Sequence, residues 1–113
     1  MPHYIIYFNQ QWVGDHSYEW FASRGSLANA VVEEAKDAGV YVCAGGVDEN
    51  VDNAFGADAT GGALEIDRGL IAATEQHIGG LTIIDVADDD AAKMWAGKIA
   101  VACGWPQQVR RLI

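Results

Sequence analysis

Basic residues are scarce in this chain of 113 residues, which has 7 Lys and Arg against 16 Asp and Glu and a formal net charge of −9. Binding to the phosphates of nucleic acid or of an anionic membrane requires neutralisation by lysine and arginine. We therefore expect neither nucleic acid nor a membrane as a partner. Long apolar runs are also missing, because no stretch approaches the roughly 20 residues that span a bilayer.

Cysteine is nearly absent, with only Cys43 and Cys103 in the chain. A disulfide framework needs more cysteines in a secreted context. We expect two buried free thiols in a reducing cytoplasm, and no signal peptide, because no basic segment precedes an apolar stretch at the N-terminus. Closely spaced metal ligands and a phosphate-binding glycine loop are missing too, so the sequence predicts no metal and no cofactor.

The length predicts a single domain over residues 1–113, with the 50% hydrophobic content of an ordinary globular protein. Helical periodicity predicts a helix over 18–38, between an N-cap at Ser17 and Gly39. A second helix begins at the acidic run 88–90 and stops at Gly104. Residues 47–61 are expected to form a long solvated connection, and residues 68–80 to be irregular. Five strands are expected, at 3–8, 40–46, 62–67, 81–88 and 107–113.

The order of these elements is β-α-β-β-β-α-β, which predicts an α+β fold of the ferredoxin-like type. Two helices would cover one face of a mainly antiparallel sheet. The strands at 3–8 and 81–88 carry apolar residues on both faces, so the second face also needs a cover. A copy of the same chain would provide it, and we therefore predict a symmetric homodimer.

This pattern resembles the YCII-related family, in particular its DGPF-domain branch. The resemblance rests on residues 33–40, 74–86, 88–95 and 108–113, and most specifically on His-Ile-Gly-Gly at 77–80 running into 83–86. It implies a dimeric α+β barrel with a cleft between sheet and loops, and a few relatives are thought to act on small aromatic compounds. The Asp-Gly-Pro-Phe signature falls on residues 68–71, where only Gly69 is retained.

Three residues are the candidates for acid–base catalysis. A histidine can serve as a general base, and His77 precedes two glycines, where backbone can approach a ligand closely. Alternatively, His77 bonds a loop carbonyl and holds the start of the strand. Asp85 would have a raised pKa if buried in its apolar strand; alternatively it lies at the strand end near the second helix. Asp37 lies near the acidic position of a His–Asp pair carried by some relatives, but helix 18–38 contains no histidine.

Further residues are candidates for ligand binding. His3 could face His77 across the sheet, or lie exposed at the terminus. Trp12 and Tyr18 belong to an aromatic cluster with Trp20 and Phe21 that lines a pocket or packs in the core. Arg68 could pair with Asp67 where the family signature lies, or be exposed. Other polar residues have simpler explanations, a loop role for His16 and a solvated acidic loop for Asp48, Glu49, Asp52 and Asp58.

The sequence thus leads to two hypotheses. The first is a cytoplasmic homodimer that binds a small organic molecule, with lyase- or hydrolase-like acid–base chemistry by His77 and a carboxylate, Asp85 or Asp37. The second is a non-catalytic structural or regulatory dimerisation module. The two differ in whether polar side chains, His77 among them, converge in a concave pocket.

Overall fold

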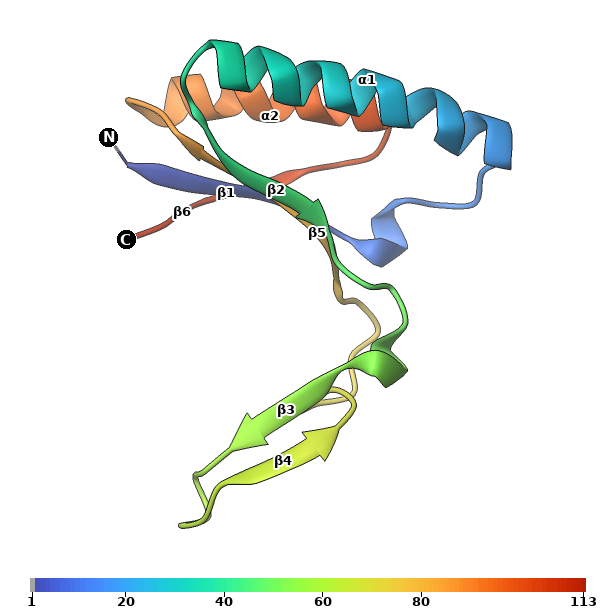
Figure 1. The fold of residues 1–113 in the computed structure, drawn as a ribbon, viewed down its shortest axis with the longest axis vertical. Coiled ribbons are helices and arrows are strands. Elements are labelled where there is room, and N and C mark those ends of the chain that lie inside the picture. The colour runs from blue at the N-terminus through green and yellow to red at the C-terminus, as the bar shows by residue number, and fades with distance from the viewer. Residues whose placement is uncertain (1) are drawn as a thin grey trace.

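The structure is a computed structural model that describes residues 2–113, and it contains two helices, a four-stranded sheet and a separate two-stranded hairpin (Figure 1). The protein is therefore α+β, as predicted. In chain order the elements are β1 (His3–Asn9), the 3-10 turn η1 (Gln10–Trp12), α1 (Tyr18–Asp37), β2 (Tyr41–Gly46), the 3-10 turn η2 (Val51–Asn53), β3 (Phe55–Asp58), β4 (Glu65–Arg68), β5 (Ile78–Asp85), α2 (Asp89–Cys103) and β6 (Gln108–Arg111).

The four-stranded sheet has the order β2-β5-β1-β6, and every neighbouring pair is antiparallel. Both helices lie side by side on the same face of this sheet (Figure 1). The predicted single helical layer on an antiparallel sheet is confirmed. β1 and β5 are the central strands, so they carry the residues that the helices bury.

Both helices begin at the predicted caps. The Ser17 hydroxyl accepts a hydrogen bond from the backbone N–H of Trp20 at 3.1 Å, and the Asp88 carboxylate accepts one from Ala91 at 2.9 Å. Each bond satisfies a backbone donor that the first helical turn leaves without a partner. At the other end of α2, Gly104 has a φ of 89°, a left-handed conformation that suits glycine.

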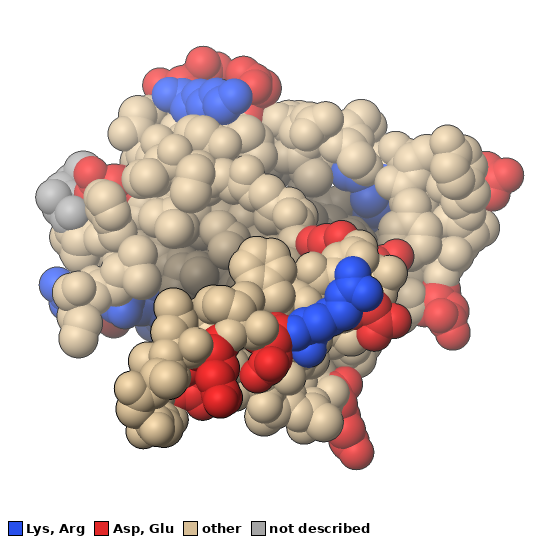
Figure 2. Space-filling view, turned by 60° about the horizontal axis from the view of Figure 1, so that its bottom comes forward, with Lys and Arg blue, Asp and Glu red and all other residues tan. Residues whose placement is uncertain are grey.

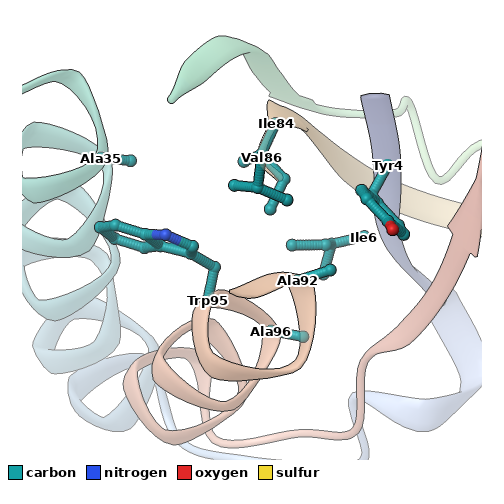
Figure 3. Packing of buried hydrophobic residues seen from close by; sticks show 8 residues of the cluster. All are labelled: Tyr4, Ile6, Ala35, Ile84, Val86, Ala92, Trp95 and Ala96. Atoms are coloured by element: carbon teal, nitrogen blue, oxygen red, sulfur yellow. The ribbon is translucent and has the colours of Figure 1, made fainter. Parts of the chain in front are cut away.

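The core lies between the helices and the two central strands. Ile6 of β1 and Ile84 of β5 are fully buried, at 0% exposure. Trp95 of α2 packs with them from the helical layer (Figure 3). The remaining members of the core cluster are Tyr4, Ala35, Val86, Ala92 and Ala96. Alternate residues of β1 and β5 therefore face the helices, as the period of two in a strand requires.

Within residues 2–113, neither α1, α2 nor a further strand covers the other face of the sheet, although Trp12 stacks on Tyr7 there. Ile5 and Tyr7 of β1 point away from the helices, because Tyr4 and Ile6 point towards them. Leu81 and Ile83 of β5 are their antiparallel partners and share this face. We call these four half-buried side chains the open face.

The largest departure from the predicted fold is the segment between β2 and β5. Residues 47–61 were expected to form a long solvated connection, and most of them are exposed, but they also contain η2 and β3. The strand expected at 62–67 is present as β4, but it does not join the main sheet. β3 and β4 instead pair only with each other, in an antiparallel hairpin. This hairpin projects on the open-face side from the two helices and the four-stranded sheet, which we call the body (Figure 1). We call residues 54–71 the arm. β3 was missed because its sequence, Phe-Gly-Ala-Asp, has no β-branched residue to indicate a strand.

Three smaller predictions also need correction. The central strand begins earlier and ends earlier than 81–88, at Ile78 and Asp85, because the residues after it turn to form the cap of α2. The strand expected at 107–113 is limited to Gln108–Arg111. The two cysteines are free, but they are not both buried. Cys43 is exposed on the edge strand β2 and Cys103 is half-buried.

Candidate functional site

His77 is held by the 3-10 turn that follows β1. Its backbone N–H donates to Oε1 of Gln11 at 3.0 Å, and its ring Nδ1 lies 3.1 Å from Nε2 of the same glutamine. In the reverse direction, the backbone N–H of Gln10 donates to the His77 carbonyl at 2.8 Å. A single turn of chain therefore fixes both the backbone and the ring of His77 at the start of β5.

These bonds determine which ring nitrogen carries the proton. A backbone N–H can only donate, so the oxygen of the Gln11 amide faces it and the NH₂ group faces the ring. An NH₂ group can also only donate, so Nδ1 accepts and the proton of the neutral ring is on Nε2. His77 Nε2 is buried and has no hydrogen-bond partner within residues 2–113. The ring thus offers a donor rather than a basic lone pair.

The two glycines after His77 serve packing of the sheet. A Cβ atom on Gly79 would lie 2.6 Å from Cε2 of Phe8, and one on Gly80 would lie 2.8 Å from Cε1 of the same ring. Both glycines are buried. The Phe8 side chain therefore occupies the space that a ligand would need in order to approach this backbone, and no ligand is required to explain the glycine pair.

Asp85 lies at the opposite end of β5 and pairs with His3. The two residues are cross-strand partners, and His3 Nε2 is 3.7 Å from Asp85 Oδ2. The side chains are 45% and 35% exposed, which makes this a surface pair of small energetic value. Asp85 is thus a partly exposed carboxylate and not one fully buried in the strand.

The predicted catalytic residues do not converge. His77 and Asp85 are eight residues apart along one extended strand, a separation of roughly 25 Å at about 3.3 Å per residue. No proton can pass directly between His77 and Asp85 over such a distance. Asp37 is exposed at the C-terminal end of α1, just before the turn that leads into β2. Asp37 precedes Tyr41, which pairs with Ile84 near the Asp85 end of β5, so it lies away from His77 as well.

The predicted ligand-binding residues are dispersed as well. His3 is beside Asp85, and Trp12 is near His77, where its indole N–H donates to Gln76 at 3.2 Å. Tyr18 is 85% exposed at the start of α1. Arg68 is on the arm, opposite Phe55 in the hairpin. These four residues therefore belong to four separate places on the molecule.

The predicted aromatic cluster divides into two groups. Trp20 stacks on His16 with ring centroids 3.6 Å apart, and the edge of Phe21 contacts both rings. Trp12 instead stacks on Tyr7, 6.4 Å away. The His16 ring also bonds the carbonyl of Val13 at 3.0 Å, which confirms its role in holding the loop before α1.

A cavity of about 420 Å³ lies on the helical side of the sheet, near the edge formed by β2. Its floor is formed by the small residues Ala44, Gly45 and Gly46, which leave the space between this edge and α1 unfilled. Most of the other lining side chains are apolar. Polar groups are carried by Asn29, Tyr41, Thr82, Cys103 and Gln107. His77 is not among the residues that line this cavity.

Two of the polar lining groups have distinctive environments. The Nε2 atom of Gln107 is buried and has no hydrogen-bond partner within residues 2–113. An amide donor in that position is costly to leave unpaired, so a ligand acceptor would stabilise it. Burial raises the pKa of the Cys103 thiol, which therefore stays protonated and weakly nucleophilic. The cavity can therefore bind a ligand, but its Cys103 thiol is not an activated nucleophile.

Sequence reasoning did not find this cavity. Gln107 was assigned to a terminal strand, and its role depends on the fold bringing it beside α1 and β2. The one available signal was the run of small residues 44–46 on a strand, which leaves a gap wherever a helix packs over it. From its sequence, that run is assigned to a strand and not to a phosphate-binding loop.

Neither known protein families nor curated proteins give a match to this chain. Within residues 2–113 the structure contains no group of three His, Cys, Asp or Glu residues placed to hold a metal ion. Over the same residues, neither α1 nor α2 has the length and apolar character to cross a bilayer.

Proposed function

We propose that this protein is a homodimer that binds a small, mainly apolar organic molecule in the cavity between α1 and the β2 edge of the sheet. The observation that carries the proposal is the cavity itself, with the buried and unpaired Gln107 amide on its wall. The volume of about 420 Å³ falls within the range of roughly 300–1,000 Å³ that is usual for ligand pockets.

The chemistry of the walls indicates the kind of ligand. Apolar residues such as Phe8, Val32 and Ile99 would contact an apolar body. A carbonyl or carboxylate oxygen on the ligand would accept from Gln107, and Asn29 and Thr82 offer further polar contacts. This combination of an apolar site with a few placed polar groups is typical of small-molecule recognition.

Binding is favoured over the acid–base chemistry that the sequence suggested. His77 presents Nε2–H as a donor, and within residues 2–113 neither ring nitrogen is hydrogen-bonded to a carboxylate. We therefore do not assign lyase- or hydrolase-like catalysis to His77 with Asp85 or Asp37. His77 is better explained as the residue that fastens the η1 turn to the start of β5.

The strand order β2-β5-β1-β6, with helices on one face, supports the proposal of a ferredoxin-like subunit of the YCII-related type. The open face then supports a dimer like that of the α+β barrels, since burying apolar side chains is favourable. Both thiols are free, and one is exposed, which suits a reducing cytoplasm.

The ligand proposal is tested by thermal shift against a panel of small aromatic and aliphatic carboxylates and amides. The variant Ala28→Leu fills the cavity from α1, and Ala22→Leu is the matched control at an exposed position of the same helix. We expect some compounds to raise Tm for the wild type and for the control but not for Ala28→Leu. Compounds that stabilise Ala28→Leu as well as the wild type would refute the assignment of this cavity.

A second candidate function, a non-catalytic dimerisation module, is favoured by a separate observation. The arm carries five large apolar side chains that are at least 41% exposed: Phe55, Leu64, Ile66, Leu70 and Ile71. Exposed apolar surface on this scale marks an interaction site. On this view the association would be the function, and the cavity would remain empty.

A further inference from the structure

We propose that the arm is a clasp between two copies of the chain, whose apolar face packs against a second copy seated on the open face. This inference rests on the homodimer of the proposed function and deepens it by naming the surface that forms the contact.

The arm has two chemically different faces. Cross-strand pairing places Phe55 opposite Arg68 and Ala57 opposite Ile66, so these four side chains share one face. Phe55 is 78% exposed and Ile66 is 59% exposed. The other face carries the acidic residues Asp58, Glu65 and Asp67. One face of the hairpin is therefore mainly apolar, with Arg68 at its edge, and the other is mainly acidic, with Ile71 lying over Gly56. Such a hairpin can lie with its apolar face on a surface and its acidic face towards solvent.

Within the described chain nothing covers the apolar face of the arm. β3 and β4 form a sheet of their own and pair with no third strand. A two-stranded hairpin of this kind is marginally stable in water unless it packs against another element. The Ile71 side chain packs within the arm, over Gly56 on the acidic face. The stabilising surface must therefore come from another molecule.

The chain exposes more surface than a compact protein of its size, as expected if part of that surface contacts another molecule. The radius of gyration is 16.2 Å, whereas a compact domain of this length has about 13 Å. The accessible surface is 7466 Å², compared with about 6,000 Å² for a compact protein of the same mass. The excess of roughly 1,400 Å² exceeds the roughly 800 Å² that each partner buries in a standard interface.

A second copy would cover the apolar face of the arm and the open face at the same time. The arm projects on the side of the open face (Figure 1), and a shaded hollow lies between the arm and the body (Figure 2). The sheet of a second copy entering this hollow would cover Ile5 and Ile83 while it contacts the arm. A two-fold axis makes the arrangement reciprocal, so that each copy is held by the arm of the other and no apolar surface remains for further copies.

The proposal is tested by sedimentation equilibrium on the full chain. The double variant Phe55→Ser, Ile66→Ser alters only exposed side chains and is expected to leave the body folded, as circular dichroism and thermal melting would verify. The control is Val101→Ser, which removes a side chain that is 79% exposed on α2, on the other side of the sheet. We expect a wild-type dimer, an unchanged control, and a dissociation constant raised at least about tenfold in the double variant.

Each other outcome has a definite meaning. A wild-type dimer with an equally tight double variant would overturn the clasp and leave the homodimer intact. A wild type that stays monomeric throughout the concentration range would overturn both the clasp and the homodimer. Binding of ligands in the helix-side cavity is measured separately by thermal shift, so neither result decides the ligand-binding proposal.

Discussion

The body and the arm use similar residues with opposite results. In the body, Ile84 lies on a strand that two helices cover, and it is fully buried. In the arm, Ile66 lies on a strand of comparable geometry, and it is 59% exposed. The difference is whether another part of the same chain packs against the strand. A strand pattern specifies which side chains share a face, whereas burial of that face depends on a cover that the same chain supplies in one region and omits in the other.

The largest expected effect comes from the same substitution made in both regions. Ile84→Ala should lower the free energy of unfolding by about 2–5 kcal/mol, because it leaves a cavity in the core. Ile66→Ala should change it by less than about 0.5 kcal/mol, because the side chain has little to lose in the monomer. Both free energies are measured by urea denaturation at protein concentrations too low for the dimer to form. A comparable loss in the two variants would contradict the division between body and arm.

The next comparison concerns two helix caps. Asp88→Ala removes the cap of α2 and should cost about 1 kcal/mol, since α2 forms part of the core. Asn50 caps the short η2 turn at the base of the arm, accepting from the Asp52 N–H at 3.1 Å. Asn50→Ala should affect unfolding of the body by less than about 0.5 kcal/mol. If both caps proved equally important in urea denaturation, the base of the arm would belong to the body.

A smaller effect is expected where the arm returns to the body. Gln11→Ala removes both side-chain bonds to His77 and should cost about 0.5 kcal/mol, since these bonds are exposed. Nitrogen chemical shifts of the ring should show the proton on Nε2 in the wild type. In Gln11→Glu a carboxylate oxygen replaces the NH₂ group, so Nδ1 should become protonated. A wild-type ring with its proton on Nδ1 would refute the orientation of Gln11.

The smallest effect is confined to the turn of the arm. The backbone N–H and the hydroxyl of Thr60 donate to Asp58 and lower the pKa of its carboxyl group. Because this pKa is lowered on folding, the bonds stabilise the turn above the ordinary pKa of aspartate, and the contribution is lost as pH falls through the lowered value. Thr60→Val should raise the Asp58 pKa in an NMR titration and leave the Tm of the body unchanged. An unchanged pKa would contradict this account.

The sequence predicted the body well because its signals are local. Ser17 and Asp88 cap the two helices where expected, and Gly104 ends the second one in a left-handed conformation. The arm escaped prediction because β3 is short and rich in small residues. Its nature depends on a missing cover, which no local pattern can reveal.

The candidate site was harder to predict because it depends on contacts between distant residues. His77 was found by its position before two glycines, but the proton on its ring is determined by Gln11, 66 residues away in sequence. The glycines themselves accommodate Phe8. Gln107 carried no signal of its own, because its unpaired amide exists only once α1 and β2 enclose the cavity.

Amide hydrogen exchange of β3 and β4 at two protein concentrations tests the central claim most directly. If the arm is stabilised by a second copy, its amides should exchange rapidly in dilute solution and much more slowly at high concentration. The amides of β1 and β5 should be protected at both concentrations. Arm amides that exchange equally fast at both concentrations, under conditions where the protein dimerises, would contradict the clasp.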